Sequence, residues 1–166
     1  MKKIILTAVA VFGFAFANAQ EGGFKVGAHV GLPTGDIKDF TSVNLGLDAA
    51  YTWKIDAKFD LGVTTGYSVF LGKKVNFGGG IEIKAEDSSY IPLAASAQYA
   101  IGDNFFLGAD LGYAFLLDSD GDSGGFLYQP KVGYSFGKTD LFLGYKGISV
   151  DGGTYSSLNL GVAFKL

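Results

Sequence analysis

The chain has 166 residues, of which 26 are Gly and none is Cys, and its formal net charge at pH 7 is −3. The absence of Cys excludes a disulfide framework, a thiolate metal site and a Cys nucleophile, while the lack of any Arg together with the negative charge argues against a nucleic-acid binder. The apolar share of 48% is too high for a disordered chain, and the length predicts one domain.

The N-terminus has the three parts of a secretory signal peptide. Two Lys follow the initial Met, residues 4–17 form an almost unbroken apolar run, and residues 17–19 read Ala-Asn-Ala, an A-x-A cleavage site. The apolar run is short for a spanning helix, which needs about 20 residues, and an uncleaved N-terminal anchor is the alternative. We therefore divide the chain into a signal peptide, 1–19, and one β-barrel domain, 20–166.

The remainder of the chain alternates between two kinds of side chain with a period of two, which is the pattern of strands. Strands of about ten residues have the length that a tilted membrane-spanning strand needs. The alternation predicts eight of them: 24–32, 43–53, 61–71, 91–99, 105–115, 126–136, 141–146 and 158–166.

The connections between these strands alternate between short and mostly longer ones. The longest is 72–89, whereas residues 102–104 and 137–139 are enough for two of the short ones. This alternation is typical of outer-membrane barrels, which have short periplasmic turns and longer extracellular loops. It predicts that both chain termini lie in the periplasm.

The two faces of the strands differ in size as well as in polarity. One face is mostly Gly, Ala, Ser and Thr with a few charges, and the other carries most of the large apolar and aromatic side chains. An eight-stranded barrel has room inside only for side-chain filling, so the large face would overfill it. We therefore predict that the apolar face points outward into lipid and that closure pairs the backbone. A secreted β-sandwich is the alternative.

Two short segments resemble a known family. Residues 89–94 read Ser-Tyr-Ile-Pro-Leu-Ala and residues 105–108 read Phe-Phe-Leu-Gly. With the signal peptide and the alternating strands, they are similar to the outer membrane protein β-barrel domain family, which includes PorT-like proteins, and to small barrels of the OmpX/OmpA-transmembrane type. The resemblance covers the whole mature chain. The last strand departs from the family pattern because it ends in Leu166 instead of an aromatic residue.

The resemblance implies an all-β fold, an eight-stranded antiparallel up-and-down transmembrane β-barrel. It places the chain in the bacterial outer membrane, in contact with outer-membrane lipid and inserted by the barrel-assembly machinery.

Charged residues on the inward face are the main candidates for a site. A charge inside a narrow barrel must be paired or solvated, so we interpret them as an ion-pair network that fills the lumen, with a channel lining as the alternative. Asp110 is expected diagonally opposite Lys131, within side-chain reach. The predicted network comprises Lys25, His29, Asp48, Asp60, Asp110, Lys131, Lys146 and Lys165.

The sequence gives little support for catalysis or for a bound cofactor or metal. His29 and Asp48 lie on neighbouring strands among Ser and Thr, which are the residue types of a hydrolase, but no spacing singles them out. The acidic segment 118–125 begins like a calcium loop, yet Ser123 and Gln129 stand where an EF-hand needs Gly and Glu. We predict no enzyme, no cofactor and a solvated acidic turn.

Aromatic residues near the periplasmic strand ends form a predicted interfacial girdle. Its members are Phe24, Tyr51, Trp53, Tyr99, Phe105, Phe136 and Phe164.

The longest loop is the predicted contact for an extracellular protein partner. Within 72–89, two β-prone segments flank Gly78 to Gly80, and a hairpin there would offer a strand edge to such a partner. A mobile loop is the interpretation that we favour.

These observations predict an integral outer-membrane protein, monomeric, with a structural or surface-interaction role and no open pore. The alternative is a narrow channel or transporter, or a subunit of a secretion or uptake machine. No ligand is indicated by the sequence.

Overall fold

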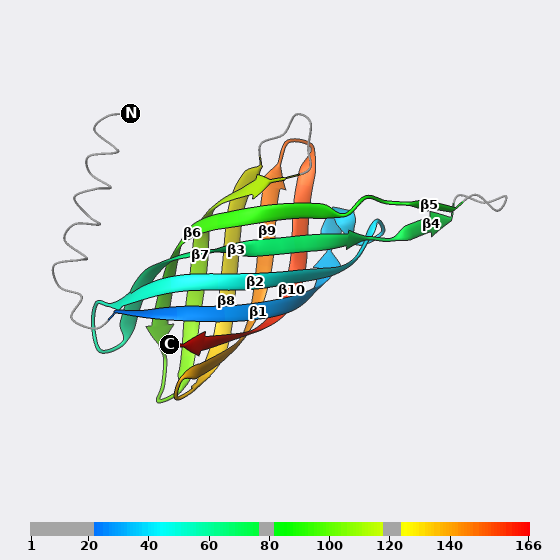
Figure 1. Cartoon of the computed structure of the whole chain (residues 1–166). Coiled ribbons are helices and arrows are strands. Elements are labelled where there is room, and N and C mark those ends of the chain that lie inside the picture. The colour runs from blue at the N-terminus through cyan, green and yellow to red at the C-terminus, as the bar shows by residue number, and fades with distance from the viewer. Residues whose placement is uncertain (1–21, 77–81, 118–123) are drawn as a thin grey trace, which may run out of the picture.

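The computed structural model describes residues 22–76, 82–117 and 124–166, and the signal-peptide prediction therefore lies outside the described residues. The described chain forms ten strands and one short 3₁₀ helix, η1 (Gly35–Ile37) (Figure 1). The strands are β1 (Gly22–Thr34), β2 (Thr41–Lys54), β3 (Phe59–Gly72), β4 (Lys74–Asn76), β5 (Glu82–Lys84), β6 (Ser88–Ala100), β7 (Phe105–Leu116), β8 (Gly125–Phe136), β9 (Thr139–Val150) and β10 (Gly153–Lys165).

Eight of these strands close into a barrel in the order β1-β10-β9-β8-β7-β6-β3-β2, and every neighbouring pair is antiparallel. Each barrel strand pairs with the barrel strands before and after it along the chain, and β10 pairs with β1 to complete the circle. The predicted eight-stranded up-and-down barrel is therefore confirmed.

The barrel strands are longer than the sequence predicts, at 12 to 14 residues. In β9, Gly147 interrupts the alternation of side chains, but its backbone still pairs with Ser156 of β10 and Tyr128 of β8. Backbone pairing on both sides extends a strand past the point where its side-chain pattern weakens.

The barrel has two distinct ends. At the first, which we call the termini end, lie Gly22, Lys165 and the three short turns 55–58, 101–104 and 137–138. At the opposite end, the loop end, lie η1, the β4–β5 hairpin, the strand ends Leu116 and Gly125, and the two-residue connection 151–152. The three turns at the termini end are all short, whereas the described connections at the loop end differ in length.

The connection between β3 and β6 is a hairpin, whereas we favoured a mobile loop. β4 pairs with β5 in antiparallel register with Val75 opposite Ile83, and the amide of Ala85 donates to the carbonyl of Lys73 at 2.8 Å. In Figure 1 this hairpin projects well beyond the barrel wall. Two β-branched residues at paired positions favour strand over irregular backbone.

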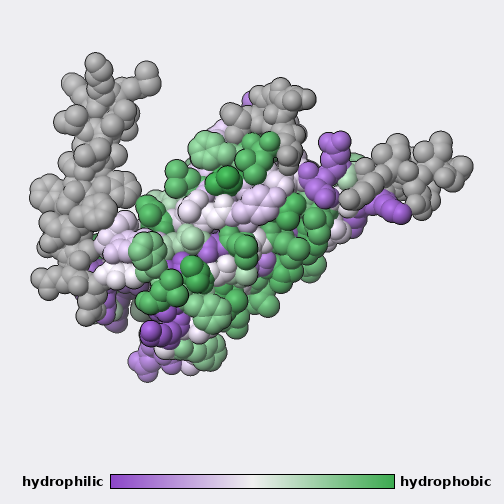
Figure 2. All heavy atoms as spheres, viewed as in Figure 1, coloured by the Kyte–Doolittle hydropathy of each residue, from purple (hydrophilic) through white to green (hydrophobic). Residues whose placement is uncertain are grey.

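Burial is inverted relative to a water-soluble protein. Outward-facing Leu47 and Leu111 are 66% and 54% exposed, while the inward polar side chains of Asn44 and Ser157 are fully buried. Figure 2 shows apolar side chains over much of the visible wall, with hydrophilic ones gathered mostly toward the ends. Apolar side chains on the outer face suit contact with lipid hydrocarbon, and buried polar side chains on the inner face suit a lumen filled by side chains.

Glycine on the inward face lets neighbouring strands approach closely. A Cβ added at Gly66 would overlap the carbonyl oxygen of Leu47, and one added at Gly112 would overlap that of Leu93. Because backbone cannot yield as a flexible side chain does, these positions require Gly.

A compact apolar cluster fills the lumen near the loop end, and we call it the plug. Ile37 of η1 packs against it together with Val150 and Tyr155. The plug consists of Phe70, Tyr90, Ala94, Ala114, Leu127 and Ile148. Sequence analysis did not single it out, because its members come one or two at a time from five separate strands.

Candidate functional site: the barrel lumen

Between the termini end and the plug, three groups of polar side chains cross the lumen. The first group centres on Asp140 of β9, which is 3% exposed. Its carboxylate meets the Nζ atoms of Lys25 and Lys165, each at 3.0 Å, and accepts the hydroxyl of Ser135 at 2.6 Å. Lys25 also donates to the Gln98 side chain at 3.1 Å.

Asp140 is absent from the predicted network, although it organises this group. The sequence pattern left it between the predicted turn 137–139 and the expected strand, which begins at Leu141. Its position nevertheless keeps the inward phase of Phe142 and Lys146 on the same strand, and that phase could have identified it. Asp60 lies on β3, where the backbone register places it opposite Lys54 of β2 and Gln98 of β6, and it lines the cavity at the termini end.

The second group joins β7 and β8. Lys131 Nζ lies 2.8 Å from both carboxylate oxygens of Asp110, and the Ser96 hydroxyl donates to Oδ1 at 2.5 Å. In the backbone register Asp110 pairs with Gln129 and Lys131 with Gly108, so the ion pair is diagonal. The expected relation between Asp110 and Lys131 is therefore present in the structure.

The third group surrounds His29 just below the plug. Its Nδ1 lies 2.6 Å from Asp48 Oδ2, and its Nε2 lies 2.9 Å from Lys146 Nζ and 3.2 Å from Ser68 Oγ. Lys146 Nζ also lies 5.7 Å from the centre of the Tyr90 ring, which belongs to the plug. This group thus links the ionic part of the lumen to its apolar part.

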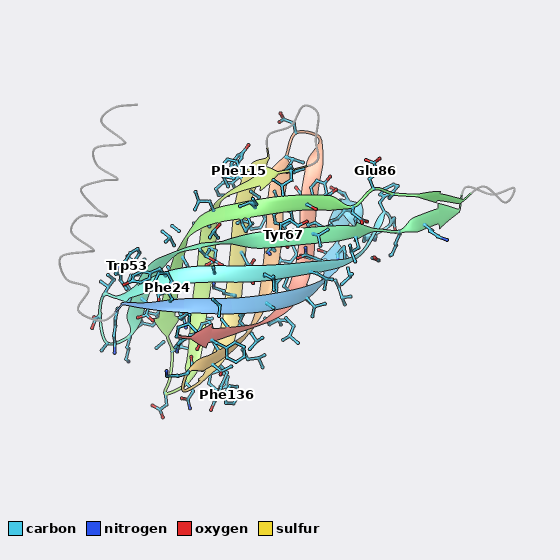
Figure 3. The ribbon with its side chains drawn as sticks, in the orientation of Figure 1. Phe24, Trp53, Tyr67, Glu86, Phe115 and Phe136 are labelled. Carbon is cyan, nitrogen blue, oxygen red and sulfur yellow. The ribbon has the colours of Figure 1, made fainter. Side chains whose placement is uncertain are left out.

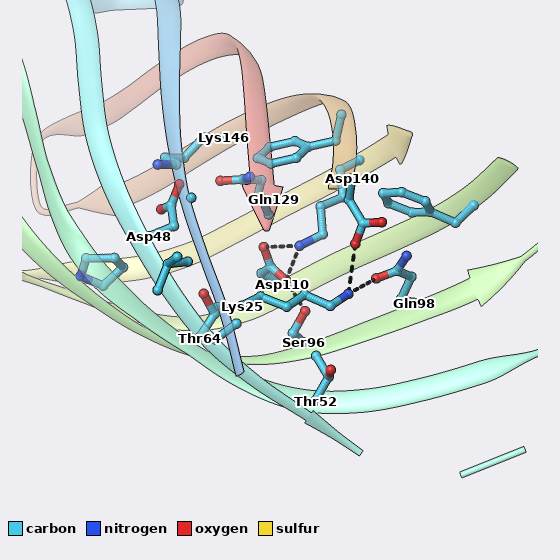
Figure 4. Close-up of a pocket in the computed structure, with 18 of the residues that line it drawn as sticks. Lys25, Asp48, Thr52, Thr64, Ser96, Gln98, Asp110, Gln129, Asp140 and Lys146 are labelled. Carbon is cyan, nitrogen blue, oxygen red and sulfur yellow. Dashed lines mark hydrogen bonds and ion pairs between the residues drawn. The ribbon is translucent and has the colours of Figure 1, made fainter. Parts of the chain in front are cut away.

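A small cavity of about 80 Å³, which we call the chamber, lies among the three groups (Figure 4). It has room for roughly three water molecules, since each takes up about 30 Å³ in the liquid. The charges on its wall balance, with three ammonium groups and three carboxylates: Lys25, Lys131, Lys146, Asp48, Asp110 and Asp140. Charge balance and solvent together make this set of buried charges tolerable.

A larger cavity of about 500 Å³, the vestibule, lies at the termini end. Lys25 and Gln98 line both the vestibule and the chamber. Figure 4 shows Lys25 reaching across the lumen to Gln98 and Asp140. The bridge from Lys25 to these two side chains therefore stands between the two cavities.

Asp48, His29 and Ser68 have the contact order of a catalytic triad. Ser68 is only 1% exposed, however, and lines neither the chamber nor the vestibule. The Nε2 atom that would accept its proton already faces the Lys146 ammonium. The Ser68 hydroxyl is therefore buried away from both cavities, and its contacts lie within the lumen network.

The described part of the chain holds neither a membrane-spanning helix nor a cluster of metal-binding side chains. No helix there is both long and apolar enough to cross a membrane. Across residues 22–76, 82–117 and 124–166, no three His, Cys, Asp or Glu side chains gather as a metal site would need. The acidic segment considered for calcium, 118–125, lies almost wholly outside the described residues.

The predicted girdle residues all lie toward the termini end, and most are exposed on the outer wall. Phe24 and Phe136, labelled in Figure 3, have the largest exposed fractions, and Phe24 packs edge-on against Tyr51 with ring centres 4.7 Å apart. Trp53 differs, since it is 7% exposed and packs against Tyr51 at 5.0 Å. The exposed members besides Phe24 and Phe136 are Tyr99, Phe105 and Phe164.

A second set of outward aromatic residues lies toward the loop end, and sequence analysis did not name it. Tyr113 and Phe115 of β7 pack with ring centres 5.0 Å apart, and Phe126 and Tyr128 of β8 stack at 6.4 Å. They share the outward phase of the girdle residues on the same strands, which is the pattern that could have found them.

Comparisons with known proteins find solved structures of similar fold. No family model matches the chain, and no curated protein matches its sequence. Among solved structures, Ail, the attachment invasion locus protein of Yersinia pestis, matches with a TM-score of 0.60 at 13% identity, covering 87% of this chain and 97% of that one. Neisserial surface protein A matches with a TM-score of 0.50 at 19% identity, covering 87% and 96%.

This chain has the fold of the small outer-membrane β-barrels. A structure of Ail in phospholipid nanodiscs matches as well, with a TM-score of 0.58 at 13% identity over 88% of this chain and all of that one. The likeness extends over nearly the whole length of both chains, so the barrel is the common element.

Proposed function

We propose that this barrel is an integral protein of the bacterial outer membrane, with both termini in the periplasm. We further propose that it acts as a monomer, is inserted by the barrel-assembly machinery and has a structural or surface-interaction role without an open pore. The apolar outer wall and the aromatic residues at both ends support a membrane-spanning position. The plug is the observation that best supports a lumen without an open pore.

The plug supports a closed lumen for a steric reason. Phe70 and Ala114 have no exposed surface, and Tyr90, Leu127 and Ile148 are almost as fully buried. Close-packed apolar side chains exclude water and therefore ions. Below the plug, the ion pairs of Asp140 and Asp110 narrow the same path.

Conductance tests this proposal directly. The purified barrel in planar bilayers is expected to give no sustained unitary currents, whereas the triple variant Phe70→Ala, Tyr90→Ala, Ile148→Ala, which removes most of the plug, is expected to give them more often. Steady unitary currents from the wild-type barrel would overturn the closed lumen. They would favour the alternative, a narrow channel or transporter.

The orientation is tested separately by surface labelling, because the chain has no Cys of its own. Lys38 lies at the loop end and Asp103 at the termini end, and both are exposed. In intact cells a membrane-impermeant maleimide is expected to label Lys38→Cys and to spare Asp103→Cys. Labelling of Asp103→Cys alone would place the termini outside.

The β4–β5 hairpin favours a surface partner, because it extends beyond the barrel wall and a hairpin leaves unpaired backbone on its outer edges (Figure 1). Ail shows that a barrel of this fold can have such a role, since its name refers to attachment and one of its structures holds a heparin analogue. The same hairpin could equally dock a subunit of a secretion or uptake machine.

Site-specific photo-crosslinking examines this role. Glu86 is exposed at the hairpin base, as Figure 3 shows, and Asp103 supplies a matched exposed position at the opposite end. A photoreactive residue at 86 is expected to yield an adduct on cells, and one at 103 is expected to yield none of the same mass. Identical adducts from both positions would argue against a hairpin-specific partner.

A further inference from the structure

His29 lies where its Nε2 atom faces two alternative partners. Lys146 Nζ is 2.9 Å away and Ser68 Oγ is 3.2 Å away. An ammonium group donates hydrogen bonds and accepts none, so Nε2 accepts the bond from Lys146. The ring is therefore neutral and carries its proton on Nδ1, where Asp48 Oδ2 accepts it at 2.6 Å.

The Ser68 hydroxyl is placed to accept a hydrogen bond from a protonated Nε2 atom. Its hydroxyl donates to the carbonyl of Leu45 at 3.1 Å and accepts from Asn44 Nδ2 at 3.0 Å. A hydroxyl has a second lone pair, and that lone pair is left for a donor on the side where His29 lies. A protonated Nε2 would thus find an acceptor without any movement of β3.

We propose that His29 and Lys146 form a proton-operated latch beneath the plug. At neutral pH the ring accepts from Lys146 and holds its ammonium against the Tyr90 ring, 5.7 Å from the ring centre. When acid protonates His29, Nε2–H donates to Ser68, and the two adjacent positive charges repel. Lys146 then moves into the chamber that it lines, and Tyr90 loses the cation beneath it.

The groups that face the His29 ring are compatible with this change of hydrogen-bond partner from Lys146 to Ser68. From β2, Asp48 faces the ring, and from β9, Lys146 faces it; β3 contributes only the Ser68 hydroxyl, and the residue of β10 paired with His29 is Gly161. Farther away, Tyr90 of β6 lies beyond Lys146.

The other four charged side chains on the chamber wall pair with one another. Lys131 of β8 is paired with Asp110 of β7, and Lys25 of β1 itself is paired with Asp140. The charged groups in direct contact with the His29 ring are therefore one carboxylate, Asp48, and one ammonium, Lys146.

Nuclear magnetic resonance of the full barrel in phospholipid nanodiscs tests the latch. At pH 7.5 the ¹⁵N signals of His29 should show a proton on Nδ1 and an unprotonated Nε2. Between pH 7.5 and 5 Nε2 should become protonated, and the Tyr90 ring and Ile148 methyl signals should shift with the same midpoint. A proton on Nε2 at pH 7.5, or plug signals that stay fixed while His29 titrates, would overturn the proposal.

Two variants separate the latch from a general effect of acid. His29→Gln keeps an acceptor for Lys146 but cannot titrate, and Lys146→Met keeps the length of the side chain without its charge. Both are expected to abolish the pH-dependent shift of the Tyr90 and Ile148 signals, whereas Lys165→Met, which removes an ammonium at the termini end, should retain it. Persistence of the shift in Lys146→Met would refute the coupling. The wild-type titration decides the matter even where a variant does not fold, and it is independent of whether the lumen conducts.

Discussion

Replacement of Asp110 by Asn measures how far the lumen depends on its central ion pair. The carboxylate takes two contacts of 2.8 Å from Lys131 and one hydrogen bond of 2.5 Å from Ser96. Asn preserves the shape but leaves the Lys131 ammonium without a countercharge. Breaking a buried pair in this way costs about 3–5 kcal/mol in free energy of unfolding.

The partial exposure of Lys131 brings the expected loss of stability below that range. Its side chain is 15% exposed and lines the chamber, so water solvates part of the unpaired charge. We therefore expect a loss of about 2–3 kcal/mol, which corresponds to roughly a 30- to 150-fold change in the ratio of folded to unfolded protein. The double variant Asp110→Asn, Lys131→Gln places two neutral amides in the same space and should recover to within about 1 kcal/mol of wild type.

Equilibrium urea unfolding from lipid vesicles measures both values. Trp53 is the only Trp of the chain and packs against Tyr51 at the termini end, which makes its fluorescence a reporter of the folded barrel. Equal losses for the single and double variants would show that shape, and not charge, holds the two residues together. A single-variant loss below about 0.5 kcal/mol would refute the reasoning altogether, because surface pairs already reach that size.

Three further changes probe other parts of the lumen by the same unfolding assay. Phe70→Ala should lower the free energy of unfolding by about 3–5 kcal/mol, because it empties a fully buried position of the plug; an unchanged midpoint would mean that the plug collapses without cost. Gly66→Ala should prevent folding or strongly destabilise it, since its Cβ meets the Leu47 carbonyl, while Gly102→Ala, with open space around it, should be neutral; similar stabilities would contradict the close approach of the strands. Asp140→Asn leaves two Lys without their carboxylate and should cost about 2–3 kcal/mol, and wild-type stability would show that solvent replaces it.

The sequence by itself determined the wall of this barrel. A period of two fixes which residues share a face, and the contrast between small and large side chains decides which face is inside. His29, Asp48 and Lys131 could therefore be assigned to the lumen from their positions alone. The same reasoning missed Asp140, because the expected strand began at Leu141, although backbone pairing extends the strand to Thr139 and Asp140 keeps the inward phase.

Only the tertiary structure decided which inward residues meet when their strands do not follow one another along the chain. His29 and Lys146 are 117 residues apart and come together because β10 closes against β1 and brings β9 within reach of the His29 ring. The plug likewise needs five strands at one level, and that level is set by the stagger of neighbouring strands and their tilt. Alternation determines the direction of each side chain, whereas the stagger of the closed sheet determines its height, and contact across a lumen requires both.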